Sequence, residues 1–342
     1  MRVRPLLRRE MALYMEVLMP EFRTIAGMID YLADEETDRT LSVRLAGVDL
    51  SSADVRVLFA VIRMARKYVA LDLSACTGLT VWERYTGVEN NDAYTPERTG
   101  LTVWERYTDA GTGTDRVVSL ALPDALTEIA EGADKAATFS SFASLKTLRA
   151  KGVVTVGGYA FSGCGALAEV NLPQATSIGD GAFSDCTALA EANIQQVAGI
   201  GDCAFSGCTA LAEINLSWAT CVGSRAFSGC TALAKISLPL ITSIGAYAFS
   251  DCYKLESLIL GAKVPAHFGS EMFYAAGRDT EAGFTIFVPD EEAKKCLNNE
   301  IAMSCNSGIS FLDGPFDYDS SSKFFGYDSP GKFREVTTLS HG

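Results

Sequence analysis

The middle of the chain repeats itself every 22 residues over five successive copies. In each copy a phenylalanine is followed three positions later by a cysteine and three positions after that by a leucine. The columns are Phe161, Phe183, Phe205, Phe227 and Phe249, then Cys164, Cys186, Cys208, Cys230 and Cys252, and then Leu167, Leu189, Leu211, Leu233 and Leu255. A strict period of this length indicates a solenoid, in which each copy forms one coil and packs against its neighbours.

Each copy predicts a short strand, a turn and a return segment. Leu167, Val170 and Leu172 end in an alternating apolar pattern, which is typical of a half-buried strand. Pro173 ends the strand, because proline lacks the amide that a sheet requires, and the chain then returns through Ile178. One coil buries too few side chains to offset the entropy of ordering its residues, so only the stack is stable.

Two weaker copies precede the regular ones. The first places Phe139 and Leu148 in register, with Phe142 in the cysteine column. One step earlier, the segment VSLALP at 118–123 matches the strand, with six extra residues before Leu148. Together the copies predict six or seven coils on a parallel sheet, in a solenoid over residues 117–262.

Residues 1–73 predict an α/β cap for the core that the stack would expose at its N-terminal end. Apolar residues at helical spacing predict a helix over 22–33, and alternation predicts a strand over 41–45. A second helix is expected over 51–67, because serine and aspartate precede it and basic residues end its last turn. A further strand is expected over 69–73.

Two other segments flank the repeats. Residues 74–116 predict an inserted, acidic and largely exposed loop, in which GLTVWERYT occurs twice, 22 residues apart. Residues 263–342 predict a C-terminal cap and tail, with the last strand over 284–289 and a short, acidic-started helix over 290–298. We therefore expect one elongated α/β solenoid with a cap at each end.

Between residues 139 and 262 the repeat carries the motif AFxxCxxL, followed by a strand and by LPxxxxxIG. In these features it resembles the BspA-type leucine-rich repeat, the variant also called treponemal. The resemblance implies an α/β solenoid of leucine-rich repeat coils, curved and right-handed, with its strands on the concave side. It also implies a scaffold for protein interaction or attachment, placed at the cell envelope or surface, without known catalytic residues.

Composition and charge exclude several functions. The net charge of −13, with no face expected to concentrate positive charge, argues against a nucleic-acid partner. No apolar run approaches the roughly 20 residues of a transmembrane helix. The chain has two histidines, His267 and His341, and no glycine-rich loop with phosphate-binding spacing. We therefore expect neither an enzyme nor a bound cofactor.

The sequence leaves export open. Residues 1–20 have a basic start, but charged residues interrupt the apolar core of about 7–15 residues that a signal peptide needs. As written, this segment is not a signal peptide, which favours a location inside the cell. The family resemblance favours the envelope instead.

The cysteine column predicts buried, reduced thiols that act as small apolar residues. Adjacent coils lie about 4.8 Å apart, whereas a disulfide needs Cβ atoms about 3.8 Å apart. Paired cysteines with zinc-ligand spacing are absent from the sequence, so we expect no metal. Cys296 and Cys305 lie outside the column, and their pairing stays open.

Positions between the inward strand residues supply the candidate binding residues. They are the polar columns Glu169, Glu191 and Glu213, and Asn171, Asn193 and Asn215, together with the apolar Trp218, Leu240 and Ile259. An exposed tryptophan beside an exposed leucine is typical of a surface that anchors a partner. We therefore expect an apolar depression at the C-terminal end of the concave side, which binds a protein or an apolar ligand.

Two alternatives stay open. Trp218 either lies on the surface, as the binding hypothesis requires, or folds over its own coil or beneath the C-terminal segment. The chain is either a scaffold that binds through the concave strand face or the C-terminal apolar patch, or a purely structural protein without a ligand.

Overall fold

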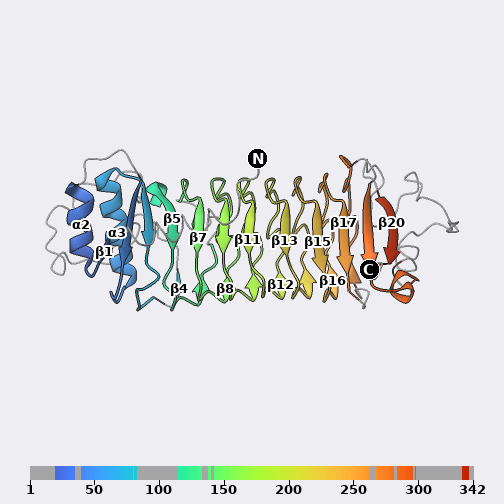
Figure 1. Cartoon of the computed structure of the whole chain (residues 1–342), viewed down its shortest axis with the longest axis horizontal. Coiled ribbons are helices and arrows are strands. Elements are labelled where there is room, and N and C mark those ends of the chain that lie inside the picture. The colour runs from blue at the N-terminus through green and yellow to red at the C-terminus, as the bar shows by residue number, and fades with distance from the viewer. Residues whose placement is uncertain are drawn as a thin grey trace.

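The computed structural model describes residues 20–34, 40–79, 81–82, 114–132, 138–139, 142–261, 267–280, 283–295, 297 and 333–338. It is an elongated stack of coils that follow one another in chain order from one end of the molecule to the other (Figure 1). Each regular coil contributes a longer strand to one face of the stack and a two-residue strand to another. The expected leucine-rich repeat solenoid with stacked parallel strands is confirmed.

The longer strands, together with the two-residue β1, form what we call the long-strand face, which is divided into two parallel sheets. The first has the order β1-β2-β3-β5-β7-β9-β11, and the second has the order β13-β15-β17-β19-β20. Their bounds are β1 Glu21–Phe22, β2 Leu41–Leu45, β3 Val69–Asp72, β5 Val117–Ala121, β7 Thr147–Arg149, β9 Glu169–Asn171, β11 Glu191–Asn193, β13 Glu213–Asn215, β15 Lys235–Leu238, β17 Ser257–Leu260, β19 Phe284–Val288 and β20 Phe333–Thr338.

The two-residue strands form a third parallel sheet, which runs without a break along the stack. Its order is β18-β16-β14-β12-β10-β8-β6-β4. The bounds are β4 Val81–Trp82, β6 Glu128–Ile129, β8 Thr155–Val156, β10 Ser177–Ile178, β12 Gly199–Ile200, β14 Cys221–Val222, β16 Ser243–Ile244 and β18 His267–Phe268. This sheet therefore joins the coils on both sides of the division in the long-strand face.

Two helices cap the N-terminal end of the stack, α2 (Ile25–Asp34) and α3 (Ser52–Ala65) (Figure 1). The start of α3 is fixed by a capping box, in which the Asp54 amide donates to Ser51 Oγ (3.2 Å) and the Ser51 amide donates to Asp54 Oδ2 (2.8 Å). Arg66, in the left-handed region with φ of 56°, ends the helix. The two predicted helices and the strands after them are thus observed.

Phenylalanine rings form a continuous column through the core. From Phe161 to Phe249, rings of adjacent coils stack with centroids 5.1–5.7 Å apart and interplanar angles of 0–12°. The column extends to Phe139 at one end and to Phe273 in the C-terminal cap at the other. Because each ring is buried between two others, the column holds neighbouring coils in register.

The cysteines of the repeat are buried, free thiols. Each thiol donates to the carbonyl oxygen of the phenylalanine 25 residues earlier, as Cys208 Sγ does to Phe183 O at 3.1 Å. All five cysteines of the column, from Cys164 to Cys252, make this bond to their own phenylalanine, with Sγ–O distances of 3.1–3.4 Å. Burial raises the pKa of Cys164 to about 12 and raises the pKa of the others too, so these thiols stay protonated at neutral pH.

Alkylation of the folded protein is expected to modify Cys221 and Cys203 and to spare the cysteine column. Cys221 is exposed and Cys203 half-exposed, whereas the column thiols are buried and protonated. The measurement is peptide mass spectrometry after iodoacetamide treatment without reductant, before and after unfolding in guanidinium. Labelling of the column in the folded protein at the rate of Cys221 would contradict the burial. Column thiols that resist labelling after unfolding would be oxidised.

The first part of the expected insertion continues a coil. Within residues 74–116, the side chains of Cys76 and Leu79 are buried, and β4 pairs with β6 in the third sheet. Residues up to 82 thus complete the coil that begins with β3. Residues 83–113 lie outside the described residues, and the domain boundaries drawn from the sequence stay a prediction.

The C-terminal end has one strand more than expected. β20 pairs in parallel with β19, so the prediction that 284–289 is the last strand is wrong. The segment FREVTT of β20 is rich in β-branched residues, but it follows a tail without the repeat pattern that would place it in the stack. Residues 291–295 are helical, and Asp290 Oδ1 accepts from the Ala293 amide at 2.8 Å, as expected for an acidic start.

Candidate functional site

In-register parallel pairing places equivalent residues of successive strands in rows across the long-strand face. The asparagine row of the first sheet runs through Arg44, Asp72, Ala121, Arg149, Asn171 and Asn193. The glutamate row, two residues earlier on each strand, holds Glu169 and Glu191 on the first sheet, and on the second it holds Glu213, which pairs with Lys235. Within each sheet, the predicted columns are therefore real rows.

The glutamate row is an exposed line of negative charge. Glu169, Glu191 and Glu213 are all exposed, and the first two are direct partners across adjacent strands. Like charges opposite each other destabilise a sheet. The row therefore gives the middle of this face a negative potential rather than added stability.

The asparagine row is interrupted where the long-strand face divides. Asn193 Nδ2 donates to Asn171 Oδ1 at 2.8 Å, but β11 does not pair with β13, which carries the next asparagine. Asn215 Oδ1 instead accepts from the amide (3.1 Å) and the hydroxyl (2.6 Å) of Ser217. As a result, the buried Asn193 Oδ1 has no hydrogen-bond donor in the described part of the chain.

An apolar pair lies in the turns beyond the strands of the second sheet. The side chain of Trp218 is 62% exposed and that of Leu240 is 49% exposed. They occupy equivalent positions of adjacent coils, where the two preceding coils carry Gln174 and Gln196. We call these two residues the Trp218–Leu240 patch.

Ile259 lies in a different place from the Trp218–Leu240 patch. It is a half-buried strand residue of β17, between Ser237 and Phe287 of the neighbouring strands. The predicted site residues thus divide into strand rows and a patch in the turns. A shared apolar depression that joins them stays a prediction.

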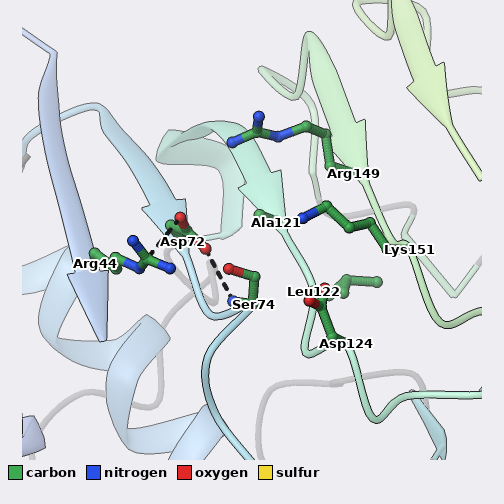
Figure 2. Close-up of a pocket in the computed structure, with 8 residues that line it drawn as sticks. All are labelled: Arg44, Asp72, Ser74, Ala121, Leu122, Asp124, Arg149 and Lys151. Atoms are coloured by element: carbon green, nitrogen blue, oxygen red, sulfur yellow. Dashed lines mark hydrogen bonds and ion pairs between the residues drawn. The ribbon is translucent and has the colours of Figure 1, made fainter. Parts of the chain in front are cut away.

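A polar hollow on the long-strand face was not found by the sequence analysis. It has a volume of about 60 Å³, and we call it the basic depression. Figure 2 shows Arg44 on one side of it, and Arg149 and Lys151 reaching across from the other side. The residues that line it are Arg44, Asp72, Ser74, Ala121, Leu122, Asp124, Arg149 and Lys151.

The carboxylate of Asp72 is held within the wall of the basic depression. One of its oxygens, Oδ1, accepts from the Ser74 amide at 2.9 Å. The other, Oδ2, lies 3.7 Å from Arg44 Nε, a distance that makes an ion pair but is too long for a hydrogen bond. Arg44 Nε is buried and has no hydrogen-bond acceptor among the described residues.

The basic depression escaped the sequence analysis because its strands do not follow the 22-residue period. Asp72, Ala121 and Arg149 are neighbours in one row, but irregular numbers of residues separate them in the chain. The signal that could have found it is a basic residue at the outward position of the weaker repeat copy, as Arg149 is.

Other kinds of site were also sought in the described residues. There, His, Cys, Asp and Glu do not form groups of three or more that could hold a metal ion. No helix in this part of the chain has the length and apolar character needed to cross a membrane.

Stacked parallel coils with aligned leucine, phenylalanine and cysteine columns define a leucine-rich repeat solenoid. The family model described as the BspA type leucine rich repeat region matches residues 112–222 and 219–279, in six copies. Residues 112–279 are therefore a BspA-type leucine-rich repeat region, as the repeat motif suggested. Comparison with curated protein sequences gives no match.

Three solved structures are similar to this chain. A leucine-rich repeat protein from Bacteroides ovatus is 23% identical, with a TM-score of 0.39, over 53% of this chain and 45% of its own. A leucine rich cell surface protein from Faecalibacterium prausnitzii is 17% identical, with a TM-score of 0.33, over 72% of this chain and 83% of its own. The pneumococcal vaccine antigen PcpA is 17% identical, with a TM-score of 0.28, over 54% of this chain and 66% of its own. The chain thus spans less than half of the first of these proteins.

Proposed function

We propose that this protein is a non-catalytic scaffold that binds a protein partner or an apolar ligand through the Trp218–Leu240 patch. The observation that carries the proposal is the exposure of these two side chains at equivalent positions of adjacent coils. Surface positions of a repeat array are free to be polar, as the two preceding coils show with glutamine. Tryptophan is among the residues that most often anchor a partner, and an exposed leucine on the adjacent coil adds apolar area to be buried.

Burying the Trp218–Leu240 patch would supply enough free energy to anchor a partner. Burying one large apolar side chain contributes roughly 1.5–3 kcal/mol, so Trp218 and Leu240 together contribute about 3–6 kcal/mol. The neighbouring glutamate row adds charge, which selects partners and speeds their encounter more than it adds affinity. The BspA-type repeat region supports attachment or adhesion at the cell envelope as the setting for this binding.

The test uses a phage-displayed peptide library, panned against the full-length protein. Each enriched peptide is titrated against the wild type and against the double variant Trp218→Gln, Leu240→Gln, which restores the residue of the preceding coils. We expect the double variant to bind at least about tenfold more weakly, because it loses more than 1.4 kcal/mol of burial. Its melting temperature should stay nearly unchanged, because both side chains are on the surface.

The matched control is Gln196→Ala, at the equivalent position one coil earlier, which should leave peptide affinity unchanged. If the enriched peptides bind the double variant as tightly as the wild type, the patch is not the binding site. If panning enriches no peptide at all, the alternative of a purely structural protein is favoured. A large fall in the melting temperature of the double variant would assign Trp218 to the core.

A further inference from the structure

The basic depression exists because one row of the long-strand face has a gap. In the asparagine row, Ala121 lies between Asp72 and Arg149 on the neighbouring strands. Its methyl group fills far less space than the side chains beside it. The gap is thus built into the sheet and is bordered by side chains from four successive strands or their turns (Figure 2).

The charges around this gap do not cancel. Arg44, Arg149 and Lys151 supply three positive charges, and Asp72 and Asp124 supply two negative ones. The walls therefore carry one excess positive charge, in a chain whose net charge is −13. In the described part of the chain, Arg149 and Lys151 form no ion pair, and Asp72 is already engaged by Arg44 and by the Ser74 amide.

We propose that the basic depression binds the carboxylate of an acidic side chain on a polypeptide partner. A volume of about 60 Å³ admits a carboxylate group, and the one excess positive charge matches its single negative charge. Guanidinium groups such as that of Arg149 bind carboxylates through paired hydrogen bonds, and a doubly charged phosphate would leave one negative charge that the walls do not balance. The proposal rests on the scaffold function but not on the Trp218–Leu240 patch.

The surroundings of the depression favour a polypeptide over another source of carboxylate. The same row continues from Arg149 to Asn171 and Asn193, whose carboxamides both donate and accept hydrogen bonds, as peptide groups do. The adjacent glutamate row would repel further acidic residues on the C-terminal side. A partner would therefore place one acidic residue over the depression and lay its backbone along the asparagine row.

The experiment is an NMR titration of the full-length, ¹⁵N-labelled protein with N-acetyl-glutamate methylamide, observed at the arginine Nε–Hε signals. We expect the Arg44 and Arg149 signals to shift, with binding at least about tenfold weaker in Arg149→Gln, which removes a charge-assisted pair. Ala121→Leu, which fills the gap without changing the charge, should weaken binding similarly. The matched control Lys235→Gln removes a charge on the second sheet and should change nothing.

Three further probes test which chemical group the basic depression binds: the neutral N-acetyl-glutamine methylamide, inorganic phosphate and glucuronate. Tighter binding of phosphate or glucuronate than of the glutamate probe would overturn the proposal, as would equal binding of the glutamine probe. Unchanged affinity in Arg149→Gln would also overturn it. The Trp218→Gln, Leu240→Gln variant should bind the probe as the wild type does, so failure of the patch and failure of this site are distinguishable.

Discussion

Replacing Phe205 with alanine is expected to lower the free energy of unfolding by about 3–5 kcal/mol, the usual loss for a fully buried phenylalanine. Its ring lies between those of Phe183 and Phe227, with both centroids 5.3 Å away, so the substitution opens a cavity and removes two stacking contacts. The measurement is equilibrium unfolding in urea followed by circular dichroism.

The milder variant Phe205→Leu serves as the matched control, because it keeps most of the apolar volume and loses mainly the ring contacts. It should lower the free energy of unfolding clearly less than the alanine variant does. Equal losses in the two variants would show that ring stacking, rather than filled volume, dominates the column. A loss below about 1 kcal/mol in Phe205→Ala would contradict the packing described here.

Replacing Gly223 with alanine is expected to destabilise the protein by about 3 kcal/mol, at the upper end of the range for overpacking. An added Cβ would lie 2.5 Å from the carbonyl carbon of Gly201 and 2.6 Å from the amide nitrogen of Asp202. Both are backbone atoms of the preceding coil, so the coils would have to separate. The melting temperature and the urea midpoint are the quantities to measure.

Gly165→Ala is the control for this substitution. At that position the added Cβ would lie 3.6 Å from Thr187 Oγ1, which is an ordinary contact. Its stability should therefore stay within about 0.5 kcal/mol of the wild type. Equal losses in the two variants would contradict the close approach of adjacent coils at Gly223, because Gly→Ala by itself restricts the unfolded chain and does not destabilise the fold.

Much of the fold could be predicted because the same residue pattern recurs in one coil after another. Identical residues at a fixed period must occupy identical environments, so the phenylalanine and cysteine columns followed directly from the sequence. The capped helix α3 was predictable because its cap depends on residues next to it in the chain, Ser51 and Asp54. The strand β20 was missed because its place depends on a distant partner, β19, and not on a repeat.

The candidate site likewise has a part that the repeat pattern predicts and a part that depends on distant pairing. The outward column of Trp218 and Leu240 was predictable, since its other members are polar. The sequence left open whether Trp218 folds over its own coil, and the structure shows its side chain exposed. The basic depression was not, because it depends on the pairing of strands that irregular insertions separate. The break after Asn193 coincides with the turn of Asn215 toward Ser217, and the repeat pattern did not predict it.

The break between β11 and β13 has a consequence for the mechanics of the molecule. In a linear array, pulling force or a local fluctuation opens the junction with the fewest bonds across it. At this junction the hydrogen bonds between the longer strands are missing. The coils stay joined by the third sheet, through β12 and β14, by backbone hydrogen bonds in the turns, such as the one that the Phe183 amide donates to Ala204 O at 2.7 Å, and by the side-chain columns. We therefore expect the solenoid to open first at this seam, into two blocks, and the exposed tryptophan belongs to the first coil of the second block.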